Sequence, residues 1–134
     1  LEDFIDVPKE YMNNKILDKW TLIKDMRKVA TGALEVKRAE KTIGSSLQAH
    51  LNFYINEEYK RILNDADMAE ISIVSSFSLK LTTPPKDSFT IDGIKQIGVL
   101  VDIAKGNKCL RCWKILEEVK KEEICNRCID VTNK

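Results

Sequence analysis

Four cysteines near the carboxyl end constrain the fold of this chain more than any other feature. They form two Cys-x2-Cys pairs separated by twelve residues, and the sequence has no other cysteine. Each pair presents two sulfurs on one side of a tight loop, and zinc prefers four such ligands in a tetrahedron. Four thiolates leave no coordination position open for water, so the spacing predicts one structural Zn²⁺ held by Cys109, Cys112, Cys125 and Cys128.

Disulfide bonds and a redox-active Cys-x-x-Cys pair are the alternatives to a metal. A cytosolic chain disfavours disulfides, and a redox pair needs a thioredoxin-like unit that this sequence lacks. A module of about twenty residues also buries too little apolar surface to fold alone. We therefore expect zinc to supply the folding energy of this module, and its loss to unfold this end first.

Positive charges surround the cysteines, and two roles compete for them. A zinc ion with four thiolates is locally anionic, so the cations can simply offset that charge. They can also bind RNA, since arginine binds phosphate or stacks on a base and an exposed indole stacks on an unpaired nucleotide. Trp113 can instead pack the module onto the rest of the protein. The candidate RNA-binding residues are Arg111, Trp113, Lys108, Lys114 and Arg127.

The composition is that of a folded protein of about one domain, with 43% hydrophobic and 32% charged residues among 134. The net charge of +1 gives no global attraction to nucleic acid, so such a role needs a local patch. No apolar run is long enough to span a membrane and no signal peptide opens the chain, so we expect a cytoplasmic protein. The first residue is not methionine, which suggests a piece of a longer protein.

The hydrophobic periodicity changes along the chain. Residues 14–41 repeat apolar side chains every three or four positions, which predicts a long helix capped by Asn13 or Asn14. Residues 47–55 alternate and predict a strand, and residues 57–64 predict a short helix. The segments 69–81 and 94–104 also alternate and predict two further strands, joined by a mobile surface connection over 82–93 that is rich in Pro, Asp and Gly.

These elements predict an α+β fold: a long helix, then a small antiparallel sheet with a short helix, followed by a zinc-finger module with four cysteine ligands. We divide the chain into the long helix (1–43), a junction domain (44–104) and the zinc module (105–134). No active site is recognisable, because the five glycines form no phosphate-binding loop and His50 has no nucleophile to partner it. We interpret His50 as an ordinary histidine.

The sequence resembles the carboxyl-terminal region of bacterial isoleucyl-tRNA synthetases. The resemblance covers nearly the whole chain and is carried by Trp20, Arg27 and 35–38 of the long helix, the junction "IGSSLQA", and "KCLRCW" at the start of the zinc module. A related finger closes bacterial formamidopyrimidine-DNA glycosylases, but their amino-terminal catalytic proline and helix-two-turns-helix segment are absent.

The resemblance implies a function that the composition does not reveal. The full enzymes join isoleucine to its tRNA with ATP, and their catalytic and editing domains lie upstream. Their HIGH and KMSKS signatures are missing here, so we expect a catalytically silent, monomeric part of such a ligase. The long helix would be the last of the anticodon-binding bundle, the four cysteines the zinc ligands, and Arg111 and Trp113 contacts to the anticodon loop. The competing hypothesis is a zinc ribbon that binds protein or DNA.

Overall fold

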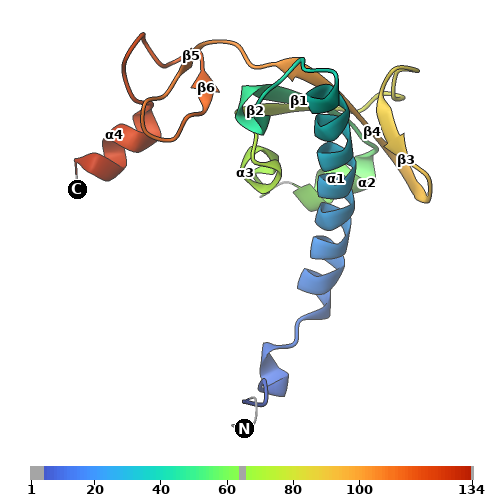
Figure 1. Ribbon diagram of the computed structural model, residues 1–134. Helices are drawn as coiled ribbons and strands as arrows, with labels where there is room; N and C mark the ends of the chain where they lie inside the picture. The colour runs from blue at the N-terminus through green and yellow to red at the C-terminus, as the bar shows by residue number, and fades with distance from the viewer. Residues whose placement is uncertain (1–4, 64–65, 134) are drawn as a thin grey trace, which may run out of the picture.

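A long helix stands against a four-stranded sheet, and a small cysteine-rich module follows at the carboxyl end (Figure 1). The computed structural model of the chain describes residues 5–63 and 66–133. The helices are α1 (Asn14–Ala39), α2 (Glu57–Leu63), α3 (Met68–Ser72) and α4 (Asn126–Thr132). The strands are β1 (Ala49–Tyr54), β2 (Ser76–Lys80), β3 (Phe89–Ile91), β4 (Ile94–Ile103), β5 (Asn107–Lys108) and β6 (Ile115–Leu116). Short 3-10 turns occupy Lys9–Tyr11 and Ser46–Gln48.

The long helix is confirmed, with the side chain of Asn13 accepting a hydrogen bond from the Ile16 N–H at its start. Only part of its predicted apolar stripe is buried. Ile16 and Trp20 are 52% and 46% exposed, because the amino-terminal half of α1 projects beyond the sheet (Figure 1). The buried part of the stripe is Ile23, Met26, Ala30, Ala33 and Leu34. Helix α1 is thus anchored at one end only.

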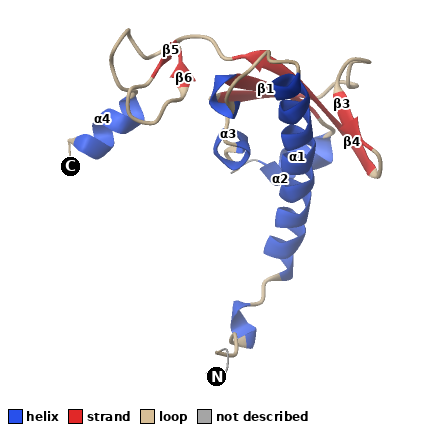
Figure 2. Ribbon diagram, in the orientation of Figure 1, coloured by secondary structure: helices blue, strands red, loops and turns tan. Residues whose placement is uncertain are grey.

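The sheet has the strand order β2-β1-β4-β3, and α1 packs against β3 and β4 (Figure 2). The alternation predicted for the first strand is confirmed, since Ala49, Leu51 and Phe53 are fully buried in the core shared with α1. On the opposite face, Asn52 donates to Asp102 and accepts from Ser78. The α+β class is therefore confirmed, with β1 at the centre of the sheet.

The sheet is mixed, whereas the sequence predicted an antiparallel one. Strands β3 and β4 form an antiparallel pair and β4 runs antiparallel to β1, but β2 lies parallel to β1. Parallel neighbours need a crossover of about a dozen residues or more. The crossover between β1 and β2 contains both α2 and α3. The sequence prediction assigned the second of these helices to a strand and so missed this crossover of two helices.

Helix α3 corrects the strand predicted over 69–81, which is real only from Ser76 onward. The side chain of Asp67 accepts hydrogen bonds from the N–H groups of Ala69 and Glu70 and so caps a helix. That helix ends at Ser72, and the next residue, Ile73, caps it with a left-handed φ of 57°. The short helix predicted over 57–64 is confirmed as α2; its last predicted residue, Asn64, lies outside the described residues.

The connection predicted over 82–93 is partly a strand. Strand β3 pairs with β4 through the two-residue turn Asp92–Gly93, and Gly93 has a φ of 88°. The ring of Phe89 lies so close to Gly32 of α1 that a Cβ there would sit 2.5 Å from it. This hairpin therefore packs against the long helix, and the strand predicted over 94–104 is confirmed as β4.

Two hydrophobic clusters organise the described residues. The larger one runs from Ile23 of α1 to Val99 of β4, and the smaller one gathers the cysteines around Val119. The division at residues 43 and 104 stays a prediction, although α1 and the sheet share one core. Among the described residues, no helix has the length and apolarity needed to cross a bilayer.

Candidate metal centre

The four cysteines sit on two turns that face each other. Cys109 follows β5, and Cys112 precedes Trp113, whose φ of 67° turns the chain back into β6. Cys125 is the residue before α4 and Cys128 lies in the first turn of that helix. The backbone N–H of Leu110 donates to the carbonyl of Glu123, which ties the first turn to the second.

The sulfur positions match a tetrahedral metal site. The four Sγ atoms lie within 4.8 Å of one another, with Cys109 and Cys128 at 3.8 Å and Cys112 and Cys125 at 3.7 Å. Four thiolates at zinc–sulfur distances of about 2.3 Å, at the corners of a tetrahedron, are about 3.8 Å apart. All four cysteines are free of disulfides. The group therefore fits one zinc ion and has no position left for a substrate or a catalytic water.

The surroundings of Cys109, Cys112 and Cys125 change the pKa values of their thiols in different directions. Burial raises the pKa of Cys125 to about 12 and also raises the pKa of Cys112. At Cys109 burial acts in the same direction, but backbone N–H groups of Cys112 and Cys125 donate to its sulfur and lower its pKa to about 6. Cys109 thus loses its proton more readily than Cys112 and Cys125, and a bound cation would favour the thiolate form of these two.

The described residues of this module form only a small hydrophobic cluster. Its buried members are Cys109, Val119, Cys125 and Cys128, with Leu116 and Ile124 packed beside them. Polar contacts add to this: Glu118 accepts from both the backbone and the side chain of Asn126, and Asn107 donates to the carbonyl of Val119. Such a core is too small to fold without a ligand.

The candidate RNA-binding residues lie around the cysteine cluster in different environments. Arg111 is exposed, and its guanidinium lies 3.8 Å from the sulfur of Cys128, where it offsets thiolate charge. The ammonium of Lys108 lies 4.9 Å from the ring centroid of Trp113, which is 60% exposed. Trp113 therefore does not pack the module onto the sheet. Lys114 is half-buried.

Arg127 is engaged with the rest of the protein rather than with the cysteines. Its guanidinium pairs with the carboxylate of Glu70 on α3 at 2.9 Å. A second link joins the backbone N–H of Ile115 to the hydroxyl of Ser75 at 2.6 Å. Sequence reasoning missed both Glu70 and Ser75, because neither lies in a motif and both are more than thirty residues from their partners.

His50 has the ordinary environment expected of it. It is half-buried on β1, and its Nδ1 lies 2.7 Å from the hydroxyl of Ser76 on the neighbouring strand. The side chain of Asn52, two residues along β1, bonds Asp102 and Ser78 instead. These contacts are cross-strand pairs of a polar sheet face.

Comparison with known proteins identifies relatives of both parts of the chain. Residues 106–131 match a family described as a zinc finger found in FPG and IleRS. The chain is 41% identical over 120 residues, 89% of its length, to an isoleucine–tRNA ligase of Bartonella henselae. It is 44% identical over 114 residues, 82% of its length, to the isoleucine–tRNA ligase of Rhodopseudomonas palustris. The chain spans only 12% and 11% of the length of these two relatives.

The zinc-finger family match and the positions of the four sulfur atoms both indicate a zinc site. The residues matched to the zinc-finger family include all four clustered cysteines. Together the family match and the sulfur arrangement support one structural zinc ion in this module.

Proposed function

Since this chain is a homologue of the isoleucine–tRNA ligases that spans only part of their length, we propose that it is the carboxyl-terminal, tRNA-binding part of such a ligase. The similarity over 89% of the chain is the observation that carries this proposal. Activation of isoleucine with ATP and its transfer to tRNA then belong to other parts of the longer protein, in the cytoplasm. This part would contribute binding energy and position.

The zinc module gives that binding part a rigid shape. We propose Cys109, Cys112, Cys125 and Cys128 as the ligands of the zinc ion, because their sulfurs have the separations that a tetrahedral site requires. The ion, when bound, fixes the two turns against each other. A surface that is rigid before binding loses less conformational entropy when RNA arrives.

The unpaired bases of an anticodon loop can stack on this surface. Trp113 is the side chain best placed for it, since it is 60% exposed and the Lys108 ammonium lies against its ring. Base stacking on an aromatic side chain is tolerant of sequence, while lysine and arginine hold the phosphates. We propose that Trp113 stacks on a loop base and that Lys108, Lys114 and Arg111 bind the adjoining backbone.

Arg111 has a second task in this proposal. Its guanidinium has five N–H donors, and the one near Cys128 leaves others for a phosphate. Arg127, the fifth candidate, already pairs with Glu70. Of the five candidate residues, Arg127 is therefore the one least expected to contact RNA directly.

The test is binding of the zinc-loaded chain to an anticodon hairpin of the isoleucine tRNA, against an unrelated RNA duplex of equal length. We expect Trp113→Ala to weaken hairpin binding by about 1–3 kcal/mol, roughly 5- to 150-fold. Trp113→Phe should retain most of the affinity because it keeps an aromatic face. Titrations at several salt concentrations separate stacking from phosphate contacts, since only the latter change the salt slope.

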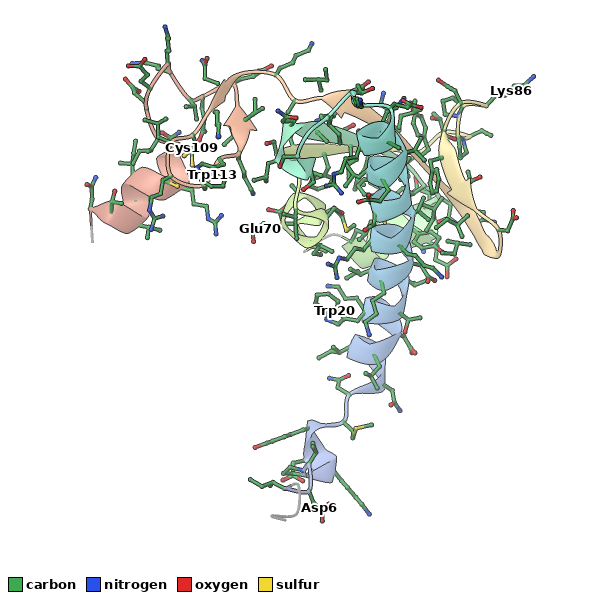
Figure 3. The ribbon with its side chains drawn as sticks, viewed as in Figure 1. Asp6, Trp20, Glu70, Lys86, Cys109 and Trp113 are labelled. Atoms are coloured by element: carbon green, nitrogen blue, oxygen red, sulfur yellow. The ribbon has the colours of Figure 1, made fainter. Side chains whose placement is uncertain are left out.

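A variant that removes a positive charge from the proposed RNA-binding surface needs a separate control. In the full-length ligase we expect Arg111→Ala to weaken use of the tRNA while amino-acid activation is unchanged, with zinc content measured in parallel because Arg111 also contacts Cys128. Lys86→Ala is the matched control, because Lys86 lies on the loop at the opposite side of the molecule from Trp113 (Figure 3). Equal affinity for the hairpin and the duplex would contradict the proposal and favour a zinc ribbon that binds protein or DNA.

A further inference from the structure

The part of the zinc module that begins at Gly106, residues 106–133, joins the rest of the protein by a short, constrained linker. At Gly106 the φ is +116°, and a Cβ there would lie 2.2 Å from the carbonyl carbon and oxygen of Leu116. Only glycine fits this close approach of two backbone segments. The linker alone still leaves rotations about the bonds on either side of Lys105, so other contacts must define the orientation of the module.

The first of these contacts is a buried hydroxyl. Ser75 is 4% exposed, and its Oγ accepts from the backbone N–H of Ile115 at 2.6 Å while donating to the carbonyl of Leu47 at 2.5 Å. The backbone N–H of Ser75 donates to the carbonyl of Ala49 of β1. A side chain held from both sides in this way connects the sheet rigidly to strand β6 of the zinc module.

The second contact is an ion pair at a different point. Glu70 lies on the side of α3 that faces the zinc module (Figure 3), and its carboxylate pairs with Arg127 of α4 at 2.9 Å. The two side chains are 50% and 66% exposed, so the pair adds little stability. Its consequence is geometric, because α4 carries the ligand Cys128 and is fixed relative to α3.

Close packing does not replace these contacts. A cleft of about 830 Å³ lies between the polar face of the sheet and the β6 hairpin of the module. Its lining comes from both sides: His50, Asn52, Ser76 and Asp102 of the sheet, and Ile115, Leu116 and Glu117 of the module. Because this cleft separates the residues that line it, the polar contacts of Ser75 and Glu70 are the candidates for orienting the module.

We propose that Ser75 and the Glu70–Arg127 pair form a two-point clasp that sets the orientation of the zinc module, and with it of Trp113, relative to the α+β body. Arg127 is then a positioning residue rather than a phosphate ligand. The proposal rests on the proposed function in one respect: the orientation matters for RNA only if Trp113 and its neighbours bind RNA. The clasp itself is independent of that function.

The orientation can be measured without RNA. Residual dipolar couplings of the zinc-loaded chain report whether the module and the body share one alignment tensor. We expect a single tensor for the unaltered protein and its loss in Ser75→Ala, Glu70→Arg and Arg127→Glu, each with one zinc per chain. Ser78→Ala is the matched control, because Ser78 lies on the adjoining strand β2 and its hydroxyl bonds Asn52, not the zinc module. A single tensor in all three variants would overturn the clasp.

A charge swap separates positioning from phosphate binding. Each single variant should bind the anticodon hairpin about two- to ten-fold more weakly, the range for one lost polar contact. The double variant Glu70→Arg/Arg127→Glu should restore both the common tensor and the affinity, because the ion pair re-forms with reversed charges. A restored tensor without restored affinity would overturn the assignment of Arg127 as a positioning residue. If the unaltered chain binds no hairpin, the proposed function fails, while the couplings still decide the clasp.

Discussion

Replacement of Cys112 by serine is expected to remove zinc from the protein and to unfold residues 106–133, while α1 and the sheet stay folded. A hydroxyl is a poor substitute for a thiolate, so the site keeps only three of its four sulfurs. Zinc binding contributes about 10–16 kcal/mol in small zinc-finger peptides. The module has Val119 as its one buried aliphatic side chain among the described residues, which cannot compensate such a loss.

Two measurements check this result. Elemental analysis should give about one zinc per unaltered chain and clearly less for Cys112→Ser, and amide resonances of 106–133 should collapse toward unfolded shifts. Chelation of the unaltered protein should reproduce the effect, and added zinc should reverse it. Leu110→Ser is the matched control: Leu110 lies between the first two ligands and is 59% exposed, so zinc should stay. Full zinc occupancy of Cys112→Ser would show that this cysteine is not a ligand.

The metal centre was predictable from the sequence because the spacing of the four cysteines is enough to indicate it. Two Cys-x2-Cys pairs imply two sulfur-bearing turns whatever their surroundings, and the structure brings all four sulfurs within 4.8 Å. The long helix was predictable for a similar reason, since its repeat extends over many turns. Both patterns lie within continuous stretches of sequence, so they can be recognised without knowing the rest of the fold.

The error at α3 has a physical origin. Ile71 and Ile73 alternate with polar residues as in a strand. In so short a segment, two apolar positions do not distinguish the two-residue repeat of a strand from the roughly 3.6-residue repeat of a helix. The Asp67 cap decides for a helix, and Ile73 then adopts a left-handed conformation that a β-branched residue rarely takes. Nothing in the local sequence predicts isoleucine there, since glycine or asparagine would be the usual choice.

The hairpin of β3 and β4 was missed although its signal is present. Asp92–Gly93 stands between Ile91 and Ile94, and an Asp-Gly pair between apolar residues is a strong sign of a two-residue hairpin turn. The prolines upstream are typical of a loop, and the loop prediction was extended over the whole segment. The contacts of the clasp differ from this case, because a surface ion pair and a buried serine leave no pattern in sequence. They depend on how α3 and α4 meet in space.

The core of the α+β body should respond to mutation independently of zinc. Phe53 is fully buried at the centre of the sheet, with its ring edge-on to Phe77 at 6.4 Å between centroids. We expect Phe53→Ala to lower the free energy of unfolding of the body by about 3–5 kcal/mol, through lost burial and the cavity that remains. Phe53→Leu, which keeps most of the volume, should cost clearly less.

The two tryptophans make this prediction measurable for each part separately. Trp20 lies on α1 and Trp113 in the zinc module, so urea titrations in Trp113→Phe and Trp20→Phe backgrounds follow one part at a time. In Phe53→Ala we expect the Trp20 transition to move to lower urea while zinc release and the Trp113 transition stay in place. Polar contacts at two points orient the module without adding much to its stability, and the zinc ion remains its main source of folding energy. A joint shift of both transitions would mean that the body and the module unfold as one cooperative unit.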